Sequence, residues 1–300
     1  MLRQNFFSYF TLSPVYQHER FVYGEDDFVI PDPHLGISAN KQDEDYLRAL
    51  SVFLSSSIIK YYLFFQSPSW GVDRNRIYFK DVKNIPVCDF SLEQIKSLSN
   101  LQRELAKAEL SGEKLANSLQ NYLDEKIQEI LKIPKNLSIL ANDFSNIRLK
   151  LNKGKVVVSA TIQPQEYELL SYGSCLRDEL DSFTEGSGLQ HKVSLTYSKN
   201  LIVCSVEFVR SDTITSLDVI VEKAQGDISL FLNYIQEKAK QRFSQWVYVQ
   251  RSLRIYDDSR VYICKSSRLI DWTRTQALND SDDIIAEILT AKRGLHEDVQ

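Results

Sequence analysis

The stretch from Ser91 to Leu131 constrains the fold more than any other part of the 300-residue chain. Leu, Ile and Ala recur along it at helical spacing, with Glu and Lys between them, and the pattern breaks around residues 111–112. Two helices joined by a short turn are therefore expected to connect two segments of different composition. The chain is thereby divided into three parts: residues 1–90, 91–148 and 149–300.

The first part is rich in aromatic residues and in the turn formers proline and glycine, which indicates short extended pieces. Residues 21–30 have the pattern of a β-hairpin with an acidic turn. Residues 46–65 carry apolar side chains at the spacing of one long helix. That helix is expected to end at Ser67-Pro68-Ser69, and a polar loop follows it.

The last part alternates strand-like and helix-like segments, which is typical of an α+β domain. The expected strands are residues 155–162, 191–197, 201–208, 217–222, 246–256 and 260–264. The expected helices are residues 166–184, 227–243 and 282–292. The whole sequence thus predicts an α+β protein with a mixed N-terminal domain, a helical hairpin as linker, and a C-terminal α+β domain with antiparallel strands.

Charge and cysteine content exclude several classes of protein. Thirty-six basic and 40 acidic residues give a net charge of −4, so a contact with nucleic acid must rest on a local basic surface. The four cysteines lie far apart, which favours reduced thiols over a disulfide framework or a zinc site. No apolar run reaches the roughly 18 to 20 residues of a membrane span, and the first residues lack the pattern of a signal peptide. We therefore expect a cytoplasmic protein without a membrane partner.

Motifs for a cofactor or for catalysis are missing from the sequence. The nearest match to a glycine-rich phosphate loop, Gly186-Ser187-Gly188, precedes no helical tract, so no bound cofactor is expected. Spacings typical of metal ligands are equally scarce, so no metal is expected either. Asp124-Glu125-Lys126 has the acid-x-lysine order of a nuclease site, but its helical context favours a solvated helix face. His18, Asp32 and His34 leave open an enzyme with an unrecognised site, although a turn explains the acidic residues there as well.

Two local groups of arginine and aromatic residues remain as candidate contacts. The first is the polar loop that holds Trp70, Arg74 and Arg76. A guanidinium group can contact guanine edges or phosphates, and an indole offers a surface for stacking. Alternatively, Trp70 packs on the preceding helix and the two arginines pair with Asp73 and Asp81. The residues alone favour neither interpretation.

The second group lies between residues 238 and 274, where nine basic residues and three acidic ones give a charge of +6. Tryptophan and tyrosine residues alternate with these charges, a pattern that suits phosphate contacts beside aromatic packing. The candidate contacts in this stretch are Arg251, Arg254, Lys265, Arg268 and Arg274. A basic face that docks on an acidic surface of another protein explains the same charges equally well.

A series of motifs runs through the first part of the chain. They are Tyr46-Leu47-Arg48-Ala49-Leu50, Leu54-Ser55-Ser56-Ser57, the aromatic run Tyr61 to Phe65, Ser69-Trp70-Gly71, Arg74-Asn75-Arg76, Lys80-Asp81 and Ile85-Pro86. This series resembles the region after the catalytic domain in adenine-specific DNA methyltransferases of bacterial restriction-modification and phage-defence systems. Residues 243–254, 271–278 and 284–287 are similar to the tail of some members, so the resemblance touches most of the chain.

The resemblance implies a part that positions double-stranded DNA, while a separate catalytic methyltransferase binds S-adenosylmethionine and flips the adenine. The chain lacks the family's Asn/Asp-Pro-Pro-Tyr/Phe motif, since Pro-Pro never occurs in it. We therefore expect the non-catalytic DNA-recognition subunit of a split or truncated methyltransferase, which is no enzyme by itself. Residues 1–90 would be its target-recognition-like region, and the aromatic residues of 6–10 and 21–28 would contact the catalytic partner. The alternatives are a protein-interaction scaffold of a bacterial defence complex without direct DNA binding, and the enzyme with a site near His18, Asp32 and His34.

Overall fold

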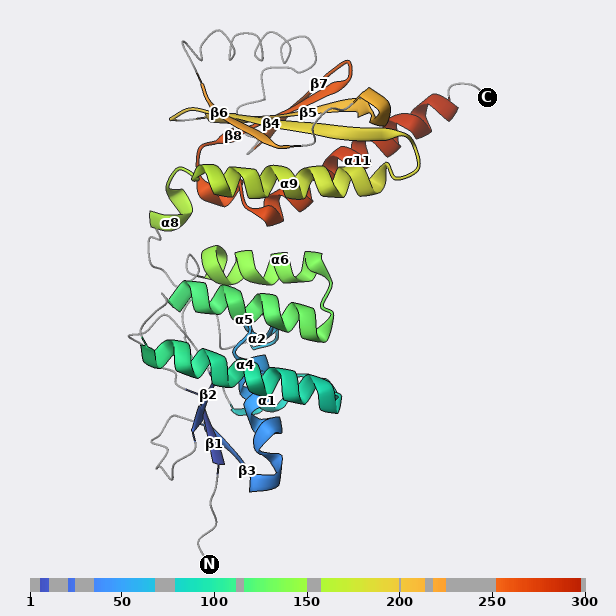
Figure 1. Cartoon of the computed structure of the whole chain (residues 1–300). Coiled ribbons are helices and arrows are strands. Elements are labelled where there is room, and N and C mark those ends of the chain that lie inside the picture. Colours follow the sequence, from blue (N-terminus) through green and yellow to red (C-terminus); the bar gives the residue numbers. More distant parts are fainter. Residues whose placement is uncertain are drawn as a thin grey trace, which may run out of the picture. The chain divides into compact units, whose positions relative to one another are not determined.

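The chain is an α+β protein that divides into two compact units, Met1–Val156 and Val157–Gln300 (Figure 1). Each unit is described by itself. The helices predicted over residues 91–131 belong to the first unit, so they do not form a separate linker. The computed structural model describes residues 6–10, 21–24, 35–67, 79–111, 116–149, 158–199, 201–213, 218–224 and 252–297.

A small antiparallel sheet opens the first unit. Its strands are β1 (Phe6–Phe10), β2 (Phe21–Gly24) and β3 (Leu35–Ala39), in the order β2-β1-β3. Along β2, Phe21 and Tyr23 are buried and Val22 is exposed, which is the alternation of a half-buried strand. Of the hairpin predicted over residues 21–30, the structure describes the first strand, β2, which pairs with β1. Residues 25–30 lie outside the described residues.

The single helix predicted over residues 46–65 is in fact two helices, α1 (Glu44–Leu54) and α2 (Ser57–Gln66), bent by 67°. The break contains three consecutive buried serines. The Ser55 hydroxyl accepts a hydrogen bond from the Phe21 N–H (2.9 Å) and lies within donor distance of the Ser51 carbonyl (2.8 Å), so it ties the break to β2. Within the described part of the chain, no one helix is long and apolar enough to cross a membrane, although this bent pair together has the required length and composition.

The predicted helical hairpin is confirmed by α4 (Leu92–Ser111) and α5 (Ala116–Leu131). Buried side chains of both helices pack with α1 in one apolar cluster, which contains Ala49, Val52, Leu98, Leu101, Leu123 and Ile127. Lys132 ends α5 with a positive φ of 53°. Other described elements of the first unit are η1 (Lys41–Asp43), α3 (Phe79–Lys83), α6 (Lys135–Asp143) and the π-helical turn η2 (Phe144–Arg148). The sequence pattern did not predict α6 and η2.

The second unit is a five-stranded sheet with two long helices on one face (Figure 1). The strand order is β6-β4-β5-β8-β7, and all neighbours are antiparallel except β4 and β6. The strands are β4 (Leu189–Tyr197), β5 (Leu201–Arg210), β6 (Ile220–Lys223), β7 (Ser252–Asp257) and β8 (Arg260–Ser266). The helices are α8 (Val158–Thr161), α9 (Glu166–Phe183) and α11 (Arg274–Glu297), with short 3-10 turns at Ser211–Thr213 (η3) and Leu269–Asp271 (η5).

Most segments predicted for the second unit are confirmed. The predicted helix of residues 166–184, the hairpin around residues 198–200 and the hairpin that ends in β8 match α9, β4–β5 and β7–β8. The predicted strand of residues 155–162 is wrong, because residues 158–161 form the helical turn α8. A hydrogen bond from the Leu269 N–H to the Ile162 carbonyl (2.8 Å) holds its end against η5, and this tertiary contact outweighs the β-propensity of Val158 and Ile162. Residues 227–243 and 246–251 lie outside the described residues.

The helix predicted over residues 282–292 begins earlier than expected, at Arg274. The Gln276 N–H donates to the Thr273 hydroxyl (3.2 Å), so Thr273 caps the helix. The Thr-x-x-Gln spacing of residues 273–276 is the sequence signal of such a cap.

Gly173 brings α9 close to the sheet, and its replacement by alanine should destabilise the second unit. A Cβ atom at this position would lie 2.6 Å from Val219 Cγ1 and 2.9 Å from Leu195 Cδ1. Overpacking of this kind costs about 1 to 3 kcal/mol, which exceeds the helix propensity of about 1 kcal/mol that alanine gains over glycine. Urea denaturation of Gly173→Ala measures the difference, with Ser171→Ala on the exposed side of α9 as control. A Gly173→Ala protein more stable than the wild type would contradict this packing.

Candidate functional site

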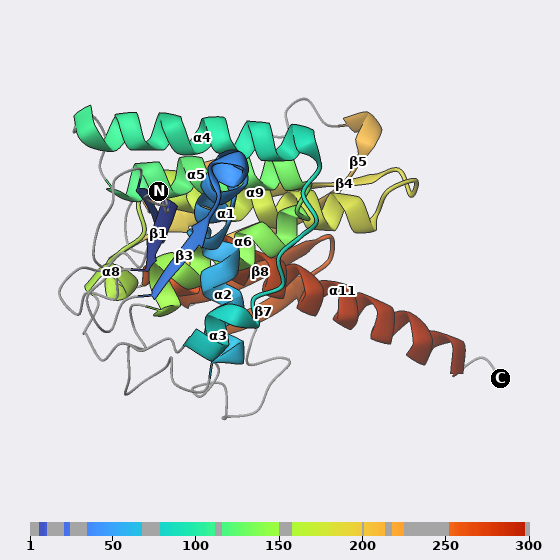
Figure 2. The same ribbon diagram turned by 90° about the horizontal axis from the view of Figure 1, so that it is seen from below.

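The loop that carries Trp70, Arg74 and Arg76 starts and ends on a fixed base. These three residues lie outside the described residues, but both flanks of the loop are described. The Ser67 hydroxyl, just after α2, donates to the Asp81 carboxylate in α3 over 2.6 Å, and both side chains are buried. Figure 2 shows α3 beside the end of α2. The hydrogen bond therefore closes the loop at its base.

The base of the loop is part of the apolar core of the first unit. Ile85, just after α3, packs in one buried cluster with Leu63 of α2 and Phe144 of η2. The Tyr62 hydroxyl also donates to the Asn84 carbonyl over 3.1 Å. Binding residues are often carried by segments whose two ends are anchored in a rigid core. Exposed Lys80 and Lys83 of α3 add positive charge on one flank of the loop.

Asp124 of α5 holds the start of α2 through hydrogen bonds to Ser57. Its carboxylate accepts the backbone N–H of Ser57 (2.8 Å), the hydroxyl of Ser57 (2.6 Å) and the side-chain amide of Gln120 (3.2 Å). The carboxylate thus caps the first turn of α2 from another helix. Burial raises the pKa of Asp124, and the hydrogen bonds from Ser57 oppose this shift.

The expectation that Asp124-Glu125-Lys126 is a solvated helix face is therefore wrong at Asp124, which is 6 % exposed. Glu125 is exposed, and Lys126 pairs with Glu129 of the same helix over 2.7 Å. Asp124 and Lys126 have separate partners, Ser57 and Glu129, so the acid-x-lysine order does not bring the two side chains together as a nuclease site would require. Asp124 is a capping residue within the core of the first unit.

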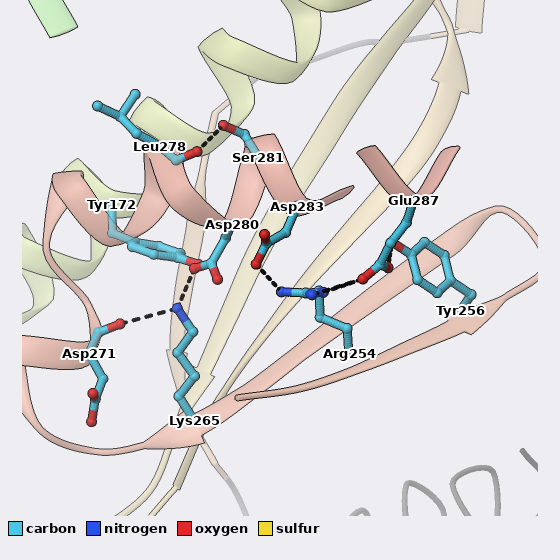
Figure 3. A network of polar contacts seen from close by, with 10 residues as sticks. All are labelled: Tyr172, Arg254, Tyr256, Lys265, Asp271, Leu278, Asp280, Ser281, Asp283 and Glu287. Carbon is cyan, nitrogen blue, oxygen red and sulfur yellow. Dashed lines mark hydrogen bonds and ion pairs between the residues drawn. The ribbon is translucent and has the colours of Figure 1, made fainter. Parts of the chain in front are cut away.

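Arg254 of β7 is engaged by the helix that covers it (Figure 3). Its guanidinium group donates to Asp283 (2.7 Å) and to Glu287 (2.8 Å), both on α11. The Tyr256 hydroxyl donates to the same Glu287, and burial together with this hydrogen bond raises the pKa of Tyr256. Arg254 thus joins the edge strand to α11, and its charge is balanced within the second unit.

Lys265 of β8 is predicted from the sequence as a candidate DNA contact on the surface. This prediction is wrong, because the side chain is buried. Its ammonium group forms an ion pair with Asp280 of α11 and lies 3.4 Å from the Asp271 carbonyl (Figure 3). Asp280 also accepts the Tyr172 hydroxyl over 2.6 Å. The same ammonium group lies 5.5 Å from the ring centroids of Tyr172 and Trp272. A DNA contact through Lys265 would break this arrangement, because the side chain is enclosed between the sheet and the helices.

Arg268 and Arg274 are the remaining candidates of the second group that lie among the described residues. Arg268 is half exposed and pairs with Asp271 over 2.9 Å. Arg274 is the first residue of α11 and is partly buried, while Arg251 lies outside the described residues. Much of the +6 charge counted from the sequence is therefore balanced by acidic residues of the same unit, which a count along the stretch does not reveal.

His191 of β4 forms a buried pair with Asp181 of α9. The His191 backbone N–H and Nδ1 both lie 2.8 Å from Asp181 Oδ1, and Nε2 has no hydrogen-bond partner within the described part of the chain. Burial lowers the pKa of His191 against the opposing effect of Asp181, so the ring is neutral near pH 7 and donates from Nδ1. The pair holds the start of β4 to the end of α9.

The stability of the second unit should fall as the pH drops below the ordinary pKa of histidine, about 6.5. The folded-state pKa of His191 is lowered, so the unfolded chain binds the proton first, and the stability present above pH 6.5 is lost as the pH falls. Urea denaturation of the wild type and His191→Gln between pH 7 and pH 5 measures this. The variant should show the weaker pH dependence, and equal dependence in both proteins would assign the effect to other groups.

The other potential sites give little chemistry. Among the described residues there is no group of three or more His, Cys, Asp or Glu side chains that could hold a metal ion. His18, Asp32 and His34 lie outside the described residues. A pocket of about 110 Å³ between β2, α1, α4 and α5 is smaller than the roughly 300 to 1,000 Å³ of ordinary ligand sites. The four cysteines are free, as their spacing predicts, and Cys88 is exposed.

Comparison of the chain with protein-family models, with curated proteins and with solved structures gives no match. The likeness to adenine-specific DNA methyltransferases therefore rests on the sequence motifs alone.

Proposed function

We propose that this chain is the non-catalytic DNA-recognition part of a split or truncated adenine-specific DNA methyltransferase that acts in the cytoplasm. The observation that supports this proposal is the closed base of the loop of residues 68–78, where Ser67 donates to Asp81. The two ends of this segment, which contains Trp70, Arg74 and Arg76 in the sequence, are anchored in a buried core, and exposed Lys80 and Lys83 follow it. S-adenosylmethionine would bind to a separate catalytic subunit.

The contacts in this proposal divide between the two units. Arg74 and Arg76 would read base edges, and Lys80 and Lys83 would contact phosphates, which set the position of the protein on the duplex. In the second unit, Arg268, Arg274 and Arg251 stay as weaker candidate contacts. Arg254 and Lys265 are left out because their charges are balanced by Asp283, Glu287 and Asp280.

Arg74→Ala and Arg76→Ala should each weaken selective DNA binding by about 1 to 3 kcal/mol, the usual contribution of an arginine that reads a base. The measurement is fluorescence anisotropy with a duplex enriched by the chain from a randomised library and an unrelated duplex of the same length. Arg210→Ala, which removes an exposed arginine at the end of β5, is the matched control and should bind as the wild type does.

Two further outcomes have a clear meaning. Wild-type affinity should fall steeply with added salt, since each phosphate contact releases counterions. Equal losses on both duplexes would make Arg74 and Arg76 backbone contacts. A wild-type chain that binds neither duplex would contradict the proposal.

A protein-interaction scaffold is the second candidate function. The observation in its favour is a pair of exposed apolar side chains on one face of α9, Tyr167 (66 % exposed) and Leu170 (37 %), three residues apart. The scaffold requires no DNA affinity, so the same titration separates the two candidates.

A further inference from the structure

Phe65, near the end of α2, presents an exposed aromatic ring next to the loop of residues 68–78. Its side chain is 63 % exposed, and the next most exposed aromatic residue among those described in the first unit is Tyr46 at 38 %. A phenylalanine ring exposed to this extent offers an apolar face on which a ligand can pack. Phe65 lies three residues before the loop begins, at the end that Ser67 fixes.

Three other rings hold Phe65 in place. The centroid of Tyr61 lies 5.0 Å from that of Phe65, that of Phe64 lies 5.3 Å away, and that of Phe144 lies 6.0 Å away. The first two pairs are edge-to-face, which is a favourable geometry for aromatic rings. Phe144 is buried in the core of the unit, so the exposed ring stands on a rigid support.

The chemical setting of Phe65 is basic. Exposed Lys80 and Lys83 come from α3, which Asp81 holds to Ser67, and exposed Arg148 ends η2, the turn that provides Phe144. An exposed aromatic ring on a unit that also exposes basic side chains suits a nucleic acid, whose bases can stack on the ring and whose phosphates are attracted by the charges.

We propose that the Phe65 ring stacks on a nucleobase of a bound DNA duplex, as a wedge at a base step beside the loop of residues 68–78. This inference rests on the proposed function and adds to it the position at which the duplex is opened. Apolar side chains such as phenylalanine are inserted between base steps in this way, and they partly unstack the bases. The contacts with Tyr61, Phe64 and Phe144 restrict the position of the ring before DNA binds.

The test uses the full chain and a set of enriched duplexes in which 2-aminopurine replaces one base at a time. This base emits more light when it is unstacked, so wild-type binding should raise its emission at one step. Phe65→Ala should lower the affinity about 5- to 150-fold, since stacking on an aromatic side chain contributes about 1 to 3 kcal/mol per base. It should also abolish the rise in emission without changing the salt dependence, because the phosphate contacts remain.

Three variants make the result specific. Phe65→Tyr keeps the ring and should behave as the wild type does. Phe65→Gln, which keeps a long side chain at this exposed position without the ring, should behave as Phe65→Ala does. Tyr167→Ala removes an equally exposed ring from the second unit and should change neither quantity. Circular dichroism melts of all the variants show whether the fold is kept.

The outcomes separate this inference from the proposed function. If the wild type binds DNA in a salt-dependent way but Phe65→Ala binds equally well with the same emission, the inference is wrong and the proposed function stands. Equal losses in Phe65→Ala and Tyr167→Ala would also overturn the inference. If the wild type does not bind DNA, both fail, and Phe65 then belongs to a contact with protein.

Discussion

Replacement of Asp280 by alanine should lower the free energy of unfolding of the second unit by about 3 to 5 kcal/mol. The change removes the only carboxylate that the described part of the second unit places on the Lys265 ammonium group, and this side chain is enclosed in the core. It also removes the acceptor of the Tyr172 hydroxyl, which is fully buried. A buried charge without a partner is more costly than the ion pair is favourable.

Tyr172 shows how strongly this site depends on Asp280. Burial, followed by the negative charge of Asp280, raises the pKa of Tyr172 well above its ordinary value, so the hydroxyl keeps its proton and donates it. The Trp272 ring closes the site with an edge-to-face contact to Tyr172 at 4.9 Å, and its indole N–H donates to the Ser266 carbonyl. The polar groups of Tyr172, Lys265 and Trp272 all have partners here. Removal of one partner therefore leaves a polar group without a hydrogen bond in an apolar environment.

A double variant tests whether the cost is that of an isolated charge. Lys265→Met combined with Asp280→Leu replaces the pair by apolar groups of similar size and should recover part of the loss, because no charge is left buried. It should still lie about 1 to 3 kcal/mol below the wild type, because the buried Tyr172 hydroxyl keeps no acceptor. Asp280→Asn should lie between the wild type and Asp280→Ala, since its amide oxygen still accepts the Tyr172 hydroxyl. Urea denaturation and amide hydrogen exchange of residues 260–266 provide the measurements. A loss below about 1 kcal/mol for Asp280→Ala would mean that water reaches Lys265.

Lys265 also shows which part of the candidate site the sequence could not predict. It lies in a basic stretch, and its partner Asp280 comes fifteen residues later, in a helix that begins at Arg274 and not at residue 282 as predicted. Arg254 is similar, because its partners Asp283 and Glu287 are 29 and 33 residues away. A charge count along the chain treats such residues as free, whereas pairing across a sheet–helix layer depends on the fold.

Local sequence patterns predicted the helices and strands better than they predicted the contacts between them. The hairpin of β4 and β5 and the helix α9 have patterns that repeat within their own length, so the sequence predicts them well. The break between α1 and α2 was missed because apolar residues such as Leu54 and Ile59 continue on both sides of it. Three consecutive serines in an apolar helix were the available signal. The residue that caps α2 lies on α5, 67 positions after Ser57.

This distant cap leads to the second large effect. Asp124→Ala should lower the free energy of unfolding of the first unit by about 2 to 4 kcal/mol, because the N–H and the hydroxyl of Ser57 lose their buried acceptor together. Asp124→Asn should cost less, since one amide oxygen remains and the Ser57 hydroxyl can turn to accept from the amide group. Urea denaturation measures the loss, and hydrogen exchange of residues 57–66 shows whether it is centred on α2. Glu125→Ala, at the exposed neighbour, should change neither measurement.

The pH dependence of the Asp124 variants distinguishes a buried cap from a solvated carboxylate. The pKa of Asp124 is raised in the folded protein, so the folded state binds the proton more readily than the unfolded chain does. The stabilisation from this group is therefore complete below the ordinary pKa of aspartate, about 3.9, and is lost as the pH rises through the folded-state value. Asp124→Asn cannot titrate, so its cost relative to the wild type should shrink as the pH rises. A cost that instead grows with pH would mean that Ser57 and Gln120 stabilise the ionised carboxylate more than burial disfavours it, and Asp124 would then cap α2 as a charge.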